Sequence, residues 1–160
     1  MFYFTSSKST SLIARKIDVQ DNVIPSSNAV MAINLFMLSR YFENNVYEHR
    51  ATKMLNVMKE NIVQSTPWFA HWAQLNLLIS QPVFEIIFTG LNAENLRNEW
   101  FLDYMPNSII AGSKSSSDMP LLKGRTKDNE SLIYICRDKT CALPVKTVKE
   151  ARSQTLLSTN

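Results

Sequence analysis

Hydrophobic and polar residues alternate over the first twenty positions of the chain. Phe2 and Phe4 precede a polar stretch at residues 5–11, and a second apolar group follows it, made up of Leu12, Ile13, Ile17 and Val19. This alternation predicts two short strands joined by a polar loop. Residues 21–28 then have the composition of a turn, and Pro25 disfavours helix at the residue before it.

Three helices are predicted between residues 29 and 79. Segment 29–42 is apolar on most sides, which is typical of a helix covered on several faces. In segment 47–63 apolar residues recur at spacings of three and four, which predicts an amphipathic helix. A short turn at residues 43–45 joins these two helices as an αα-hairpin. Pro67 begins a third, largely apolar helix that runs to about Ile79.

After Pro82 the hydrophobic period changes from that of a helix to that of a strand. The β-branched and aromatic run at residues 83–90 predicts a buried strand. Residues 93–104 predict a helix, and residues 107–112 and 131–136 predict two further strands. The succession of strand, helix and strand indicates a βαβ unit, whose first two strands are parallel.

The predicted elements make an α+β chain of 160 residues, long enough for one sizeable core. Residues 1–80 contain the N-terminal hairpin and the three helices. Residues 81–150 form a small βαβ-β region, and residues 151–160 form a tail. We expect these parts to make one compact unit.

Composition excludes several classes of function. The 17 Lys and Arg against 14 Asp and Glu give a net charge of +3, which is too weak to argue for nucleic acid or a membrane surface. With 3 glycines, Gly-rich phosphate loops are excluded. No stretch approaches the ~18 apolar residues of a membrane helix, and the first residues are too polar for a signal peptide. We therefore expect a cytoplasmic protein with no cofactor and no nucleic-acid or membrane partner.

Several stretches have a specific order of residues: LIARK at 12–16, IPSSNAVMA at 24–32, QPVFEIIFTG at 81–90, LLKGR at 121–125 and YICRDKTCALPV at 134–145. In order and spacing they resemble the C-terminal part of the thioredoxin-domain-containing family related to spermatogenesis-associated protein 20. The resemblance runs from about Tyr3 to Glu150. Members of that family join a thioredoxin-like domain to a helical toroid of the six-hairpin glycosidase and N-acylglucosamine 2-epimerase type. The chain resembles only the last portion.

The resemblance implies that the predicted helices are a slice of an (α/α)6 toroid, packed with the small sheet. Loops that lead into the inner helices of such toroids line the central cavity. The resemblance therefore implies contacts with a sugar-like ligand from the polar residues Asp21, Asn22, Ser26, Ser27 and Asn28. It also implies that the chain contributes a cavity wall to a carbohydrate-active or epimerase-like protein and is not catalytic by itself. Without the resemblance, these residues are an ordinary turn and helix N-cap.

A second function stays open, that of a stand-alone interaction or redox-accessory module that binds a partner chain. Helices 29–42 and 67–79 carry apolar residues on more faces than a small sheet can cover, so we expect self-association or a complementary chain. No carboxylate pair is singled out by spacing as a catalytic pair. His71 and the pair Trp68 and Trp72 are better explained by structural roles than by catalysis or sugar stacking.

Cys136 and Cys141 have a C-x4-C spacing at the end of a predicted strand. This spacing allows free thiols, a disulfide or redox-active pair, or part of a metal site. A metal would need further ligands, and the two histidines, His49 and His71, are distant in sequence. A continuous strand at ~3.3 Å per residue would separate the cysteines by roughly 16 Å unless residues 138–140 form a tight turn. We therefore expect two free thiols with a packing role, and no metal.

Overall fold

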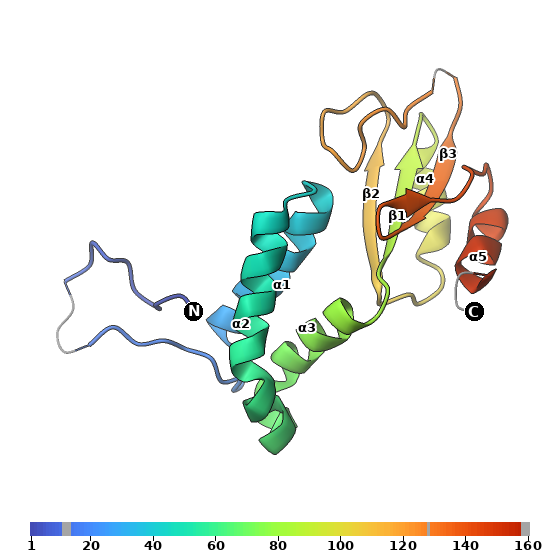
Figure 1. Ribbon diagram of the computed structural model, residues 1–160. Helices are drawn as coiled ribbons and strands as arrows, with labels where there is room; N and C mark the ends of the chain where they lie inside the picture. Colours follow the sequence, from blue (N-terminus) through green and yellow to red (C-terminus); the bar gives the residue numbers. More distant parts are fainter. Residues whose placement is uncertain (11–13, 128, 158–160) are drawn as a thin grey trace. The chain divides into compact units, whose positions relative to one another are not determined.

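The computed structural model describes residues 1–10, 14–127 and 129–157. Over these residues the chain is a mixture of α and β structure, with five α-helices, one 3-10 helix and a four-stranded sheet (Figure 1). The mixed α and β class predicted from the sequence is confirmed. The chain divides into two compact units. Residues 1–39 and 44–80 form the helical unit, and residues 40–43 together with Gln81 onward form the sheet unit.

The helical unit has helices in the three predicted segments, with bounds α1 Ser27–Tyr41, α2 Asn45–Gln64, η1 Thr66–Phe69 and α3 Ala70–Ser80. The third predicted helix, from Pro67 onward, starts within the 3-10 helix η1 and becomes α-helical at Ala70. Asn44 caps α2, because its side-chain oxygen accepts hydrogen bonds from the N–H groups of Val46 and Tyr47 at 2.9 and 3.4 Å. Helix α2 buries its apolar face and packs against η1 and α3. Among the helices described, none is long and apolar enough to cross a membrane.

The two strands predicted near the N-terminus are wrong, because residues 1–10 and 14–26 contain no strand. Leu12 and Ile13, on which part of that prediction depends, lie outside the described residues. One backbone hydrogen bond joins the two segments, from the Phe4 N–H to the Lys16 carbonyl at 2.8 Å, but at Phe2 a side chain takes the place of a strand partner. The Asn28 side-chain oxygen accepts the backbone N–H of Phe2 at 2.6 Å, and its amide nitrogen donates to the Phe2 carbonyl at 2.9 Å. With both polar backbone groups satisfied in this way, Phe2 needs no strand ladder.

The sheet unit is built on four strands in the order β2-β1-β3-β4. Their bounds are β1 Phe84–Thr89, β2 Ser108–Ser113, β3 Leu132–Arg137 and β4 Thr140–Cys141. Helix α4, Ala93–Trp100, connects β1 to β2, and these two strands are parallel. The predicted βαβ unit is therefore confirmed. Strand β3 pairs antiparallel with β1 and with β4.

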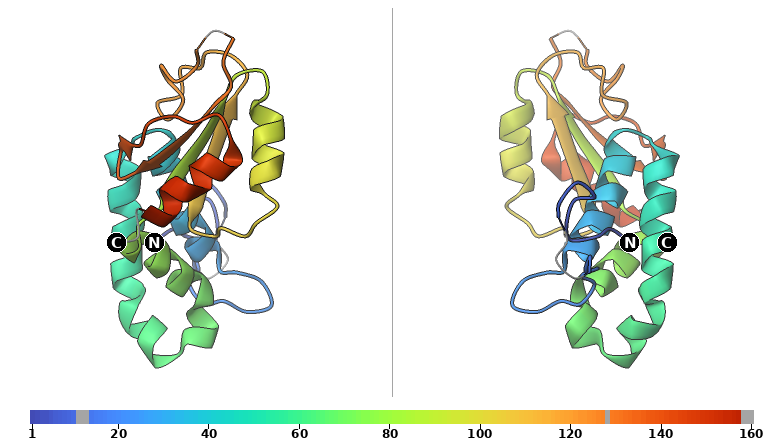
Figure 2. Two further views of the ribbon diagram at one scale, coloured as in Figure 1. Left: turned by 90° about the vertical axis from the view of Figure 1, so that its right-hand side faces the viewer. Right: turned by 90° about the vertical axis from the view of Figure 1, so that its left-hand side faces the viewer.

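The two faces of the sheet carry different residues, because successive side chains of a strand point to opposite sides. Helices α4 and α5 (Val148–Leu157) cover one face, and Figure 2 shows both on the same side of the sheet. Its core consists of Phe84, Ile86, Phe88, Ala93, Leu96, Trp100, Ile133, Ile135, Val148 and Ala151. The alternate positions of β1 lie on the opposite face, where they include the buried acid Glu85. The buried carboxyl group of β1 therefore lies on the face opposite to α4 and α5.

The tail predicted at residues 151–160 is wrong over residues 151–157, because these belong to helix α5, which begins at Val148. Its residues Val148 and Ala151 are buried in the sheet core. Thr147 and Glu150 form a capping box at its start: the Glu150 carboxylate accepts the Thr147 N–H at 3.1 Å, and the Thr147 hydroxyl accepts the Glu150 N–H at 3.3 Å. The sequence T-x-x-E at 147–150 is thus a start signal for this helix, which hydrophobic periodicity does not reveal.

Candidate functional site

Strands β3 and β4 form a tight hairpin that places Cys136 directly opposite Cys141. Arg137 pairs with Thr140, so the turn contains the two residues Asp138 and Lys139, with φ angles of 50° and 65°. Positive φ at both central positions is the geometry of a type I′ turn. The Cα atoms of the two cysteines lie 3.9 Å apart, and the sulfurs are joined in a disulfide.

The expectation of two free thiols is therefore wrong, since both cysteines of the chain are in this disulfide. The estimated separation assumed that the strand continues beyond Arg137, whereas the chain reverses there. Among the described residues, no group of three or more His, Cys, Asp or Glu side chains could hold a metal ion. His49 and His71 belong to the helical unit, and the cysteines belong to the sheet unit.

The guanidinium group of Arg125 lies beside the disulfide. Its Nη2 atom is 3.2 Å from Cys141 Sγ and 3.8 Å from Cys136 Sγ. The Nη1 atom donates to the carbonyl of Leu121 at 2.6 Å, and the Tyr134 hydroxyl donates to the carbonyl of Arg125 at 2.8 Å. These contacts fix both the backbone and the side chain of Arg125, so its charge is held against the sulfurs.

Glu85 is a buried acid on the same face of the sheet. It pairs in register with Cys136 across β1 and β3, and 4% of its surface is exposed. Side chains at opposed positions of an antiparallel pair are neighbours, with Cβ atoms ~4.5–5.5 Å apart. Burial raises the pKa of the Glu85 carboxyl, and the positive charges of Arg40 and Arg125 offset part of that rise. A group that holds a proton more tightly than an exposed glutamate therefore lies next to a sulfur.

The two sulfurs differ in their access to solvent. Cys136 is 1% exposed, whereas Cys141 is half-buried. A surface depression of about 370 Å³ is lined by both cysteines together with residues of the turn, among them Asp138 and Thr140. Cys141 is therefore the sulfur that a reagent or a second protein can approach.

The residues expected to contact a sugar-like ligand fall into two groups. Ser26 and Asn28 are each 1% exposed. The Ser26 hydroxyl accepts the N–H of Ala29 at 3.3 Å at the start of α1, and Asn28 holds the N-terminal backbone in place. Asn22 and Ser27 are exposed. Among the five residues expected to contact a ligand, Asn22 and Ser27 are those whose side chains are open to one.

Asp21 fixes the segment that carries these candidates. It is 5% exposed, and its Oδ1 atom accepts the N–H of Ser26 at 2.9 Å. Its Oδ2 atom accepts the backbone N–H of His71 at 2.9 Å and lies 3.3 Å from His71 Nδ1. The carboxylate thus connects the segment to the start of α3, within the helical unit. His71 therefore helps to hold this segment in place, which is a structural role.

The two tryptophans of the third helical segment have different environments. Trp72 is fully buried, and its indole N–H donates to the carbonyl of Val19 at 2.8 Å. Trp68 is 50% exposed and lies in η1. The core role expected for Trp72 is therefore confirmed, while Trp68 presents part of its ring to solvent.

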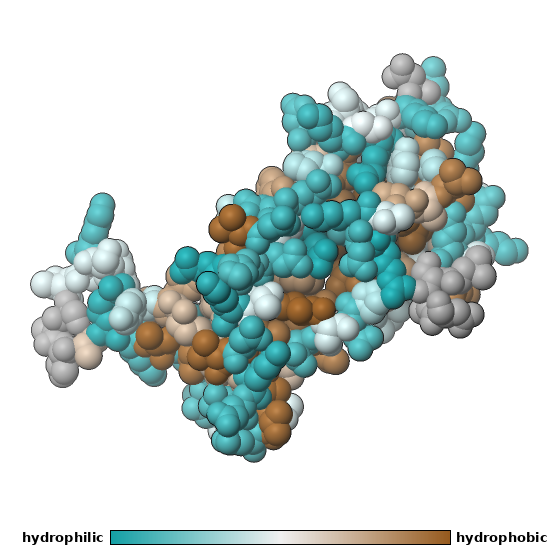
Figure 3. Space-filling model, in the orientation of Figure 1, coloured by the Kyte–Doolittle hydropathy of each residue, from teal (hydrophilic) through white to brown (hydrophobic). Residues whose placement is uncertain are grey.

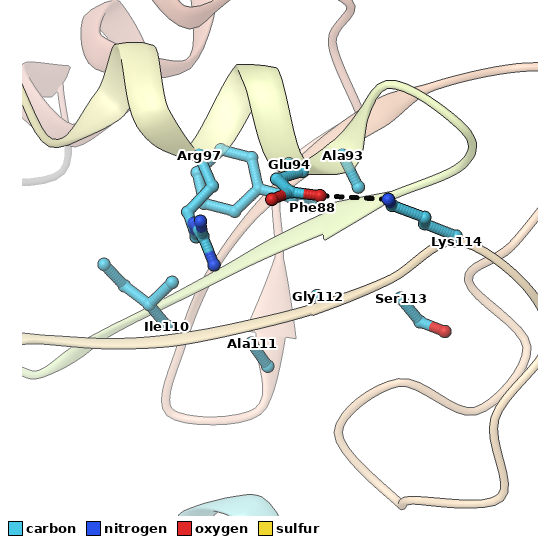
Figure 4. A pocket seen from close by; sticks show the side chains of 9 residues that line it. All are labelled: Phe88, Ala93, Glu94, Arg97, Ile110, Ala111, Gly112, Ser113 and Lys114. Atoms are coloured by element: carbon cyan, nitrogen blue, oxygen red, sulfur yellow. Dashed lines mark ion pairs between the residues drawn. The ribbon is translucent and has the colours of Figure 1, made fainter.

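The sheet unit also has a cavity of about 360 Å³ between α4 and β2, and Figure 4 shows the side chains that line it. Its walls are largely small or apolar, including Phe88 and Ile110. Lys114 Nζ pairs with Glu94 Oε2 at 2.9 Å across one end, and this hydrogen bond lowers the pKa of the Glu94 carboxyl. The lining contains neither a thiol nor a carboxylate pair, so the cavity offers less chemistry than the cysteine hairpin.

Comparisons of this chain with protein-family models, with curated proteins and with solved structures find no match. The sheet unit combines a disulfide, a fixed cation and a buried acid within one sheet face. The helical unit offers polar side chains in a segment that buried hydrogen bonds hold in place.

Proposed function

We propose that the chain is the C-terminal part of a carbohydrate-active or epimerase-like toroid protein with a thioredoxin-like domain. In this role it contributes a cavity wall and is not independently catalytic. The support from sequence is the resemblance of its stretches to the family related to spermatogenesis-associated protein 20. The structural observation that carries the proposal is the Asp21 network, which fixes the segment before α1 and leaves Asn22 and Ser27 exposed.

The exposed pair suits a polar ligand. An amide and a hydroxyl each combine donors with acceptors, as the hydroxyl groups of a sugar require. Asn22 and Ser27 lie on a segment tied down at both Asp21 and Asn28, so their positions are fixed before a ligand binds. Preorganised groups of this kind lose less conformational entropy on binding.

The helical unit also carries apolar side chains at its surface, and Figure 3 shows hydrophobic residues among the polar ones. On α1, Val30 is 39%, Met31 is 40% and Leu38 is 39% exposed, and on α3 Leu77 is 61% exposed. In a toroid, helices of this type pack against neighbouring hairpins. The exposed apolar residues thus support the proposed assembly with a complementary chain.

The test is reconstitution with the remaining toroid hairpins of a family member, expressed as a separate chain. We expect sedimentation to show a one-to-one complex, and we expect Met31→Glu on α1 to abolish it. Asn56→Glu, which adds the same charge at an exposed polar position of α2, is the matched control and should leave the complex intact. A monomer at tens of micromolar with no complex, or turnover of sugars by the isolated chain, would contradict the proposal.

The disulfide favours a second candidate, a stand-alone redox-accessory module that binds a partner chain. Such a module needs a reactive group of its own, and the Cys136–Cys141 hairpin supplies one. In this case the isolated chain, without the other hairpins, is sufficient for function.

A further inference from the structure

We propose that Cys136 and Cys141 form a thiol–disulfide exchange site for a protein dithiol, with Cys141 as the exchanging sulfur and Cys136 as the resolving sulfur. This inference specifies the reaction of the redox-accessory candidate. It is independent of the cavity-wall proposal, because it depends on residues of the sheet unit alone.

The position of Arg125 is the main observation. A disulfide sulfur is neutral and a weak acceptor, whereas a thiolate is an anion that a guanidinium stabilises strongly. Because Nη2 is 3.2 Å from Cys141 Sγ, the fixed charge is complementary to the reduced form of Cys141 rather than to the disulfide. A neighbouring arginine lowers the pKa of a cysteine thiol, so that more of it is thiolate at neutral pH.

The disulfide adds little to the stability of the fold as a crosslink. The sequence separation of the two cysteines is 5, and the stabilisation from closing a loop grows with loop length. Backbone pairing already holds the hairpin on both sides of the cysteines: Arg137 pairs with Thr140, and the Ala142 N–H donates to the Ile135 carbonyl at 2.9 Å. The two sulfurs therefore remain opposite one another after reduction, ready to close again.

The reduction proceeds in two displacements. A thiolate of the partner attacks Cys141 Sγ, which forms a mixed disulfide and breaks the bond to Cys136, whose sulfur leaves with the electron pair. Glu85, opposite Cys136 in register, gives this buried sulfur its proton. The second thiolate of the partner then attacks the partner sulfur of the mixed disulfide and releases Cys141 as a thiolate beside Arg125.

The sum of these steps balances. The partner dithiol loses two electrons and two protons and becomes a disulfide. This chain gains both, as two thiols after Cys141 and Glu85 take up their protons from water. Oxidation by a partner disulfide follows the same steps in reverse, with the Cys141 thiolate as the nucleophile.

The first experiment measures the thiol of Cys141 directly. In the full chain carrying Cys136→Ser, the alkylation rate by iodoacetamide is followed against pH. We expect the Cys141 thiol to titrate below the usual value of ~8.5. Arg125→Met should slow alkylation at pH 7 about tenfold, the effect of one pKa unit. Lys127→Met, which removes the charge of an exposed lysine two positions further along the chain, should leave the rate unchanged.

Either of two results would overturn the proposal: an ordinary or raised pKa for Cys141, or a rate that Arg125→Met does not alter. Should Arg125→Met fail to fold, Arg125→Lys and the titration of the otherwise unchanged chain still decide the question.

The second experiment tests which sulfur exchanges. Reduced chains carrying Cys136→Ser or Cys141→Ser are mixed with glutathione disulfide, and the adducts are quantified by mass spectrometry. We expect rapid glutathionylation of Cys141 and at least tenfold slower reaction of the buried Cys136. Native wild-type protein should also be reduced by dithiothreitol without unfolding. Equal rates for the two variants, or reduction only after denaturation, would contradict the proposal. Neither result bears on the sedimentation test of the cavity-wall proposal.

Discussion

Asp21 and His71 are joined through two contacts, although 50 positions separate them in the sequence. The Asp21 carboxylate accepts the backbone N–H of His71 at 2.9 Å and lies 3.3 Å from its Nδ1 atom. The same carboxylate accepts the buried N–H of Ser26. One side chain thus satisfies donors just before α1 and at the start of α3, and it determines how the segment before α1 is held.

Replacement of Asp21 by alanine should destabilise the protein strongly. It leaves the N–H groups of Ser26 and His71 without their acceptor, and an unpaired buried donor costs about 1–3 kcal/mol. We expect a loss of about 2–4 kcal/mol in the free energy of unfolding, measured by urea denaturation. Asp18→Ala is the control. Its carboxylate accepts the exposed N–H of Ser27 at 3.2 Å, so we expect a loss below about 1 kcal/mol. Equal effects of the two changes would contradict this account.

Glu85→Gln should stabilise the protein at neutral pH. Because burial raises the pKa of this carboxyl, the folded state binds the proton more tightly than the unfolded chain. The free energy of unfolding of the wild type therefore falls as pH rises from the ordinary value of 4.5 through the raised folded pKa. Glutamine does not ionise, so the variant should have a melting temperature several degrees higher at pH 7 and no advantage below pH 4.5.

Glu94→Gln provides a control in which the stability should depend on pH in the opposite direction. Lys114 lowers the pKa of Glu94, so this exposed carboxylate stabilises the folded state at pH values above its ordinary pKa. That stabilisation is lost as pH falls through the lowered folded pKa. Thermal unfolding at several pH values separates the two cases. A Glu85→Gln variant less stable than the wild type at pH 7 would show that the two arginines outweigh burial.

Residues that match the geometry of the turn between β3 and β4 should raise the free energy of unfolding of the protein. Asp138 and Lys139 have φ angles of 50° and 65°, which favour Asn and Gly in a type I′ turn. We expect the double change Asp138→Asn and Lys139→Gly to raise the free energy of unfolding by about 1 kcal/mol, with the disulfide retained. Lys123→Gly, at an exposed residue without a positive φ, should instead be neutral or destabilising. Thermal denaturation of oxidised protein and thiol counting check both statements.

The elements with a long, regular hydrophobic period were predictable from the sequence. The amphipathic pattern at 47–63 corresponds to α2, and the β-branched run at 83–90 contains β1. The period also placed β1 and β2 in a βαβ unit with parallel strands. These elements depend on local sequence and on burial of one face, and both are visible without a structure.

The candidate site could not be predicted in the same way, because it depends on the chain reversal at Asp138. The dipeptide Asp-Lys is not a strong signal for a two-residue turn, so the cysteines were expected to lie apart. The contact of Arg125 with Cys141 spans 16 positions and exists only once the hairpin forms. Glu85 lies within an otherwise apolar strand, and periodicity alone does not show that a charged side chain there is buried.

The last prediction concerns two glycines of the sheet unit that both have positive φ. Gly90 ends β1 with a φ of 90°, and a Cβ atom there would collide with the backbone carbonyl of Glu130. Gly124 has a φ of 73°, and a Cβ atom there would have no neighbour within 4 Å. Alanine at Gly124 should therefore lower the free energy of unfolding by about 1 kcal/mol, the conformational cost alone.

Alanine at Gly90 bears that same conformational cost and also forces apart the chain segments around β1 and Glu130. We expect Gly90→Ala to destabilise the protein by about 3 kcal/mol or more, measured by chemical denaturation under the same conditions. Because the backbone cost is common to both variants, their difference isolates the close approach of Gly90 to the Glu130 carbonyl. Similar losses for the two alanine variants would mean that the segment before β3 can move away from the end of β1 at little cost.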